Sequence, residues 1–156
     1  MKRTKTQAIK TSVSRTIEAD PAFVWSVLGD FGTEHRWASQ LSHCCRSTET
    51  VHVGTVRSCT LTKPIMGRSA VDEELIEFDP GKGLSYRLRG GAGPFRCAEG
   101  RWTIRPVATG TLVEVSGRFE PRCALFSFFF GGLARAAATR AAQRAIDDLS
   151  TFIEAR

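Results

Sequence analysis

The chain has 156 residues, of which 42% are hydrophobic and 24% charged, a composition typical of one soluble globular domain with its own core. It contains no run of about 18 apolar residues that could span a bilayer. The basic start "MKRTKTQAIK" lacks the apolar stretch of a secretory signal. These features argue against a membrane-spanning or secreted protein.

The net charge of +6 is concentrated at the start of the chain. Lys2, Arg3, Lys5 and Lys10 supply +4 of it without any acidic residue among the first ten, which leaves +2 for the other 146. We therefore expect a basic tail at residues 1–10. A tail on a nearly neutral domain, without a groove-reading motif, does not favour nucleic-acid binding. A weaker alternative is that the tail helps to bind ribosomes or lipids.

The cysteines and histidines show no metal-ligand spacing. The five cysteines include no CxxC motif: Cys44, Cys45, Cys59, Cys97 and Cys123. Adjacent cysteines in a strand point to opposite faces, which argues against both a zinc site and a disulfide framework. His35, His43 and His52 are scattered. We expect no metal, no cofactor and a cytoplasmic location, since the cytosol keeps thiols reduced.

The first elements in chain order are a strand and two short helices. "TSVSRTIEA" alternates apolar and polar residues, which predicts a strand. Asp20 and Pro21 are typical of a helix start, and Gly29 of a helix end. Thr33 can cap a second short helix that runs through Trp37.

Strands and turns follow over residues 41–119, and a helix ends the chain. The clusters "KPIMGRS", "DPGKG", "RGGAGP" and "VATGT" separate about six strands in a meander. A long helix is predicted over residues 133–154, about 35 Å at most. One face of it carries Ala138, Ala142, Ala145, Leu149 and Phe152.

This order predicts an α+β fold in one domain, residues 11–156. An antiparallel sheet of about seven strands must curve around the long helix to bury it. Because the helix presents mainly alanine over its first half, small side chains would leave space against a curved sheet. We therefore expect an internal cavity.

The stretch "DFGTEHRW" brings an acid, a histidine and a tryptophan together. A proton-transfer pair of Asp30 and His35 would need contact at about 2.6–3.2 Å in a sheltered pocket. Nothing in the sequence requires that contact. We interpret the stretch as a structural joint between two short helices, with Trp37 as its functional residue.

Strand register identifies a polar pair on an apolar face. If Asp79 pairs with Lys82 across "DPGKG", then Glu73 shares a face with Tyr86 and other apolar residues. One register of the preceding hairpin places Arg57 opposite Glu73. This pair could be a structural ion pair or a polar anchor for a ligand. The same register leaves Ile76 and Phe78 on the exterior, which conflicts with their apolar character.

Several motifs resemble the START-like, helix-grip superfamily, in its polyketide cyclase/dehydrase-like (SRPBCC) branch. The opening "SRTIEADPAFVWSVLGDFGTEHRW" resembles that of the family, and "GTVRSCTL", "VDEELIEFD", "LSYRL" and "GRWTIRP" resemble its strands. The opening matches at Ala19, Pro21, Val24, Trp25, Asp30, Phe31 and Trp37. The resemblance covers roughly residues 11–155. It implies a cavity for a hydrophobic ligand between sheet and helix, but it does not fix an activity.

The resemblance and the strand pattern together define candidate site residues. We expect eight residues to line the cavity: Trp37, Arg57, Glu73, Tyr86, Trp102, Val115, Phe129 and Ala138. Catalytic residues cannot be assigned, since no nucleophile elbow, phosphate loop or HExxH motif is present. The favoured function is binding of a small hydrophobic molecule such as a polyketide, lipid or aromatic metabolite. The alternative is a polyketide cyclase or dehydratase that uses Arg57, Glu73 or Tyr86.

The segment "CALFSFFFGG" is unusually rich in phenylalanine for the place before the last helix. Residues 126–130 could fill the core under the sheet. They could instead form an apolar gate at the cavity mouth or a homodimer contact.

Overall fold

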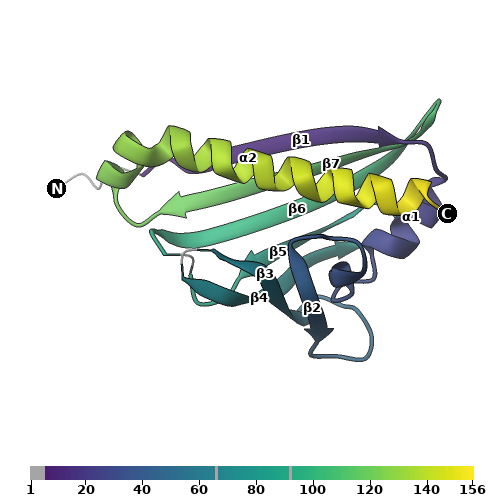
Figure 1. Ribbon diagram of the computed structural model, residues 1–156, viewed down its shortest axis with the longest axis horizontal. Coiled ribbons are helices and arrows are strands. Elements are labelled where there is room, and N and C mark those ends of the chain that lie inside the picture. The colour runs from purple at the N-terminus through teal and green to yellow at the C-terminus, as the bar shows by residue number, and fades with distance from the viewer. Residues whose placement is uncertain (1–5, 66, 92) are drawn as a thin grey trace.

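A single curved sheet and one long helix make up most of the molecule (Figure 1). The computed structural model describes residues 6–65, 67–91 and 93–156. The elements in chain order are β1 (Ile9–Ile17), α1 (Pro21–Leu28), the 3₁₀ turn η1 (Glu34–Arg36), β2 (Leu41–Arg46), β3 (Val56–Ile65), β4 (Arg68–Asp79), β5 (Gly83–Leu88), β6 (Phe95–Val107), β7 (Gly110–Pro121) and α2 (Ala124–Glu154). This arrangement confirms the predicted helix-grip fold.

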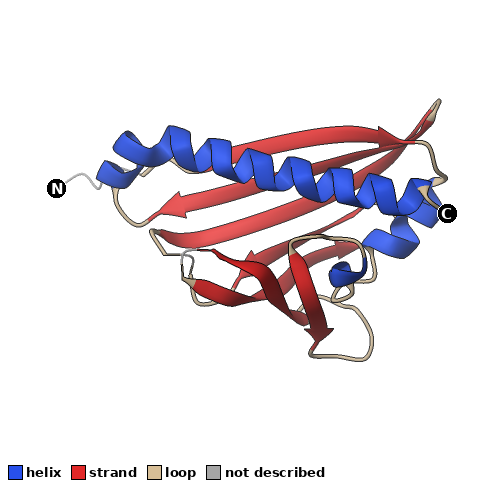
Figure 2. Ribbon diagram, in the orientation of Figure 1, coloured by secondary structure: helices blue, strands red, loops and turns tan. Residues whose placement is uncertain are grey.

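The sheet is antiparallel throughout, in the order β1-β7-β6-β5-β4-β3-β2. Strands β2 to β7 form the predicted meander, and β1 joins it beside β7. Figure 2 shows α2 lying lengthwise along the sheet, with its axis roughly aligned with the long strands. The helix packs on β1 and β7, whereas β2, β3 and β4 lie towards the other edge of the curved sheet (Figure 1). Among the described residues, no helix combines the length and hydrophobicity needed to cross a membrane.

The start of α1 follows the predicted capping chemistry. The Asp20 side chain accepts a hydrogen bond from the Ala22 backbone N–H at 2.8 Å, Pro21 occupies the first turn, and the helix ends at Gly29. The second short helix is a single 3₁₀ turn. β1 begins at Ile9, two residues before the expected domain start. Residues 1–5, half of the predicted basic tail, lie outside the described residues.

The apolar core lies where α1 and the second half of α2 meet the sheet. Ile146, Leu149 and Ile153 of α2 are buried there against Val24 and Leu28 of α1. The sheet adds Ile17, Leu75, Leu84, Trp102, Ile104, Val113 and Val115. Burial of these side chains is the main source of stability.

A β-bulge in β4 explains why the predicted register left Phe78 on the exterior of the sheet. The predicted pairs Glu73 with Leu88 and Leu75 with Tyr86 are confirmed. The register then shifts between Leu75 and Glu77, so Asp79 pairs with Gly83 and not with Lys82. The extra residue returns Phe78 to the inner face, where its ring lies 5.7 Å from that of Trp25.

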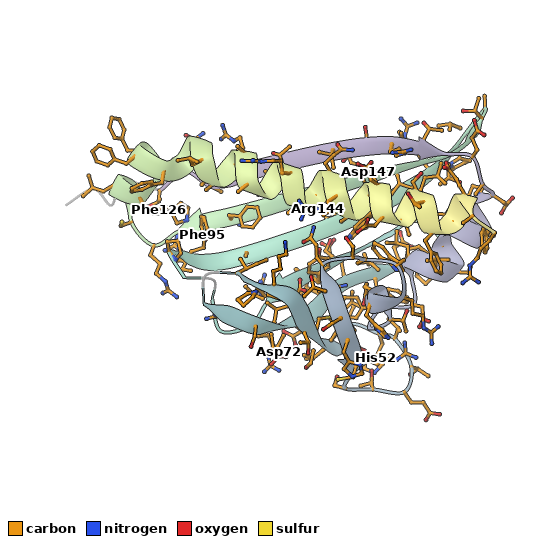
Figure 3. All side chains as sticks on the ribbon, viewed as in Figure 1. His52, Asp72, Phe95, Phe126, Arg144 and Asp147 are labelled. Atoms are coloured by element: carbon orange, nitrogen blue, oxygen red, sulfur yellow. A yellow bond between two sulfur atoms is a disulfide. The ribbon has the colours of Figure 1, made fainter. Side chains whose placement is uncertain are left out.

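Helix α2 begins nine residues earlier than predicted. The phenylalanine-rich segment is not a linker before the helix but forms its first turns, starting at Ala124. Gly131 and Gly132 lie within the helix, although each glycine costs about 1 kcal/mol there. Packing compensates for this cost: the Phe126 ring lies 5.4 Å from that of Phe95 in β6 (Figure 3).

Candidate functional site

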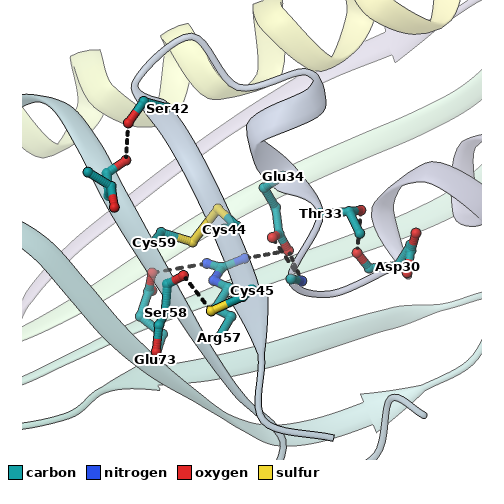
Figure 4. Close-up of a disulfide and its surroundings, with 12 residues drawn as sticks. Asp30, Thr33, Glu34, Ser42, Cys44, Cys45, Arg57, Ser58, Cys59 and Glu73 are labelled. Atoms are coloured by element: carbon teal, nitrogen blue, oxygen red, sulfur yellow. Dashed lines mark hydrogen bonds and ion pairs between the residues drawn. A yellow bond between two sulfur atoms is a disulfide. The ribbon is translucent and has the colours of Figure 1, made fainter. Parts of the chain in front are cut away.

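Arg57 is the centre of a buried polar cluster on the inner face of the sheet. Arg57 is only 7% exposed to solvent. Its Nη1 donates to Oε1 of Glu34 at 2.7 Å, and its Nη2 donates to Oε1 of Glu73 at 3.2 Å (Figure 4). The predicted pairing of Arg57 with Glu73 across β3 and β4 is confirmed. One guanidinium therefore bridges two carboxylates in a largely dry environment.

Two aromatic rings enclose the guanidinium. Its central carbon lies 4.5 Å from the centroid of the Phe31 ring and 4.2 Å from that of Tyr86. Cations are attracted to ring faces at such distances. Gly100 of β6 makes room for this arrangement, because any Cβ at that position would collide with the Tyr86 ring. The rings and the two carboxylates thus fix the guanidinium in one orientation.

The electrostatics of the cluster follow from burial and from its charges. Burial acts to lower the pKa of Arg57, but the carboxylates of Glu34 and Glu73 outweigh it, so that this pKa is raised. Burial raises the pKa of Glu73, and Arg57 opposes that rise. Burial and the Glu73 carboxylate raise the pKa of Tyr86, against the influence of Arg57. At neutral pH the cluster therefore holds a permanent cation beside a neutral phenol.

Glu34 is the partner that sequence reasoning missed. Both of its carboxylate oxygens also accept from the Gly32 backbone N–H, at 3.1 and 2.9 Å. Gly32 has φ +102°, a conformation that favours glycine, and it turns the chain so that Glu34 points inward. No periodic pattern marks an acid in such a turn. The one available signal was that Glu34 follows the buried Phe31 closely.

Trp37 is partly buried against the core, beside Trp102. The two rings meet edge to face with centroids 5.9 Å apart. Within the described part of the chain, Trp37 Nε1 and Arg57 Nε are buried without a hydrogen-bond partner. Buried donors are normally paired, so both N–H groups are free to bind an acceptor that enters this region.

The remaining predicted site residues divide into two groups. Trp102 and Val115 pair across β6 and β7 and are buried in the core. Ala138 is half-buried on α2. Phe129 lies apart from them, because its side chain is 68% exposed near the start of α2. The early start of the helix turns Phe129 outward, so the structure does not bring it to the polar cluster.

Asp30 and His35 do not form a proton-transfer pair in the structure. The Asp30 carboxylate accepts from Arg46 Nη1 at 2.6 Å. The His35 ring lies 5.5 Å from that of His43. Each residue thus has other neighbours, in agreement with the interpretation of this stretch as a structural joint.

The expectation of no disulfide was wrong. Cys44 and Cys59 face each other across β2 and β3, with Cα atoms 4.2 Å apart, and form a buried disulfide beside Arg57 (Figure 4). The alternation argument correctly placed Cys44 and Cys45 on opposite faces, since Cys45 is exposed. It overlooked pairing with the next strand. A Glu34 oxygen lies within 4.8 Å of both sulfurs, but the sulfurs bind each other and the carboxylate binds Arg57.

The fold and the cluster define a class of protein, a helix-grip domain with a buried ion-pair cluster on the inner face of its sheet. The model of the family described as polyketide cyclase / dehydrase and lipid transport matches residues 8–154. The chain belongs to this family. No curated protein matches the chain significantly in sequence.

Solved structures share the fold at low sequence identity. The protein TTHA0849 from Thermus thermophilus is 19% identical, with a TM-score of 0.73 over 94% of this chain and 97% of that one. The Zhui aromatase/cyclase from Streptomyces sp. R1128 is 17% identical, with a TM-score of 0.75 over 95% and 94%. The di-domain aromatase/cyclase StfQ of the steffimycin biosynthetic pathway is 11% identical, with a TM-score of 0.77 over 96% of this chain and 51% of that one.

Proposed function

We propose that the protein binds a small hydrophobic molecule between the inner face of the sheet and the first half of α2. The observation that carries this proposal is the Arg57 cluster, a guanidinium held between two carboxylates and two aromatic rings beside the apolar core. Among the described residues, Arg57 Nε and Trp37 Nε1 are buried donors without a hydrogen-bond partner. A ligand with an apolar body and one carbonyl or hydroxyl oxygen would satisfy these donors. The alanine-rich inner face of α2 supports space for such a body.

A second candidate function is cyclisation or dehydration of a poly-ketone chain. The neutral phenol of Tyr86 beside a permanent cation favours it, since such a pair can polarise a ketone oxygen and donate a proton to it. The family description and the aromatase/cyclase structures support the same idea. Loss of turnover in Tyr86→Phe, with ligand binding retained, would distinguish catalysis from binding alone.

The proposed location is the cytoplasm, as the cysteine pattern of the sequence predicts. The Cys44–Cys59 disulfide weighs against it, because stable disulfides are rare in that compartment. Thiol alkylation of protein in freshly lysed cells would measure the oxidised fraction. A mostly oxidised pair would contradict a cytoplasmic location.

A matched pair of substitutions on α2 tests for space under the helix. Ala138 is half-buried and its neighbour Ala137 is exposed. If the space exists, Ala138→Trp fills it and abolishes displacement of an apolar fluorophore, while Ala137→Trp has no effect. The free energy of unfolding separates the alternatives. A solid interior would make Ala138→Trp cost roughly 1–3 kcal/mol through overpacking, and that result would overturn the proposal.

The ligand itself is best sought in freshly purified protein. Native mass spectrometry should detect a co-purified small molecule, and its loss in Trp37→Ala would connect it to the site. The aromatic contact is worth on the order of 1.5–3 kcal/mol by area. His35→Ala is the control, and we expect it to change ligand binding by no more than about 0.5 kcal/mol. The opposite ranking of these two variants would restore the proton-transfer interpretation.

A further inference from the structure

The first turns of α2 expose an unusual amount of apolar surface. Five large side chains there are between 53% and 82% exposed: Leu125, Phe128, Phe129, Phe130 and Leu133. We call these five residues the aromatic patch. Scattered exposed hydrophobic residues are normal, but a contiguous group of this size marks an interaction surface. Nothing in the proposed binding of an interior ligand uses it.

The aromatic patch continues into a basic helix face. Leu125, Phe129, Leu133, Arg140 and Arg144 follow one another at spacings of four and seven residues, which places them on one side of the helix. From residue 124 to residue 146, α2 contains no acidic residue. Aromatic and leucine side chains beside arginines are typical of helices that lie in a membrane interface.

A basic hollow lies at the same end of the molecule. It has a volume of about 380 Å³ and is lined by Gln7, Ala8, Lys10, Arg118 and Arg135. Strand pairing brings Lys10 opposite Arg118, and Arg135 comes from α2. Arg118 binds Glu120, whereas in the described parts of the chain Lys10 and Arg135 form no ion pair with an acid. Two free cations in one hollow suit an anionic group.

We propose that this end of the molecule docks on the surface of an anionic phospholipid bilayer. The aromatic patch enters the boundary between headgroups and acyl chains, and Lys10, Arg118 and Arg135 hold a lipid phosphate in the hollow. The proposal requires no interior ligand, so it can fail independently of the proposed function.

A second copy of the chain is the competing occupant, which corresponds to the homodimer alternative for residues 126–130. A two-fold interface matches a patch with itself. It would bring Arg135 and Arg140 of one copy towards those of the other, with no acid on this part of the helix to compensate. The charge distribution therefore favours an anionic surface over a second copy.

Vesicle flotation tests the proposal with the full chain. We expect it to float with vesicles of phosphatidylcholine and phosphatidylglycerol in equal parts, much less with phosphatidylcholine alone, and less as salt increases. The double variant Phe128→Ser/Phe129→Ser and the variant Arg135→Glu should each weaken binding roughly tenfold or more. All three residues are exposed, so these variants should fold.

Matched controls lie far from α2's first turns. Val53→Ser changes an exposed apolar residue in the loop between β2 and β3, and Arg105→Glu reverses an exposed charge near the turn between β6 and β7. Both should bind like the wild type. Equal losses in controls and patch variants would show general charge attraction and overturn the proposed surface.

Insertion has its own spectroscopic signature. Tryptophan placed by Phe129→Trp should be quenched by brominated phosphatidylcholine in anionic vesicles, and tryptophan placed by Val53→Trp should not. Absence of vesicle binding would overturn the proposal. If the wild type then forms a dimer in analytical ultracentrifugation that Phe128→Ser/Phe129→Ser dissociates, the patch is a dimer interface instead.

Discussion

The two halves of α2 use hydrophobic residues in opposite ways. In the second half, Ile146, Leu149 and Ile153 are buried against α1 and the sheet. In the first half the inner face carries small residues such as Ala138, while Phe128 and Phe129 point outward. Burial in the second half stabilises the fold. The first half exposes most of its large apolar side chains, so they add little to the stability of the fold, and the proposed membrane surface would account for them.

The strongest test of this contrast is the same substitution in each half. Leu149 is completely buried and Leu133 is 67% exposed. Leu149→Ala should lower the free energy of unfolding by an amount near the top of the range of roughly 2–5 kcal/mol. Leu133→Ala should change it by less than about 0.5 kcal/mol. Urea titration monitored by circular dichroism measures both, and equal costs would break the comparison.

The Arg57 cluster should be nearly as sensitive as the core, for a different reason. Arg57→Met keeps most of the apolar volume but leaves the carboxylates of Glu34 and Glu73 buried without a cation, at a cost of about 3 kcal/mol. Adding Glu34→Gln and Glu73→Gln should recover part of that loss. Simple additivity of the three changes in unfolding experiments would contradict the cluster.

The disulfide links β2 and β3, the two strands at the edge of the sheet opposite β1. Cys44 and Cys59 are 15 residues apart, and closing a loop of that length contributes up to about 3 kcal/mol through the unfolded state. Reduction should therefore lower the melting temperature of the wild type. The double variant Cys44→Ser/Cys59→Ser should show no response to the reductant. A wild-type melting temperature that does not change when the reductant is added would contradict a stabilising role for this bond.

The sequence was sufficient to predict strand pairings that a short turn and alternating side chains determine. The turn "DPGKG" and alternation in β4 were sufficient to place Glu73 opposite Leu88, and from there Arg57 opposite Glu73. The disulfide escaped prediction because β2 and β3 are joined by a loop, residues 47–55, that gives no hairpin register.

The periodicity of the sequence could not predict contacts made by irregular segments. Glu34 reaches Arg57 from a 3₁₀ turn, where no periodicity assigns an inner face. The first turns of α2 were misread because glycines and phenylalanines lower local helix propensity. Packing of Phe126 on Phe95 overrides that propensity, and such a long-range contact is invisible in the local sequence.

The smallest expected effect concerns the pH dependence of the cluster. Burial raises the pKa of Glu73 above its ordinary value of 4.5. Its contribution to stability is then fully present below pH 4.5 and is lost as the pH rises through the higher folded-state pKa. Glu73→Gln cannot ionise, so we expect its stability relative to the wild type to increase over that interval. Thermal melts between pH 4 and pH 8 give this difference, with Glu114→Gln, an exposed strand position, as the control.

A wild type that gains stability over Glu73→Gln as the pH rises would mean that attraction to Arg57 outweighs burial. Glu73 would then stabilise the folded state, as the buried residues in the second half of α2 do. It would not be a site residue whose burial lowers the free energy of unfolding.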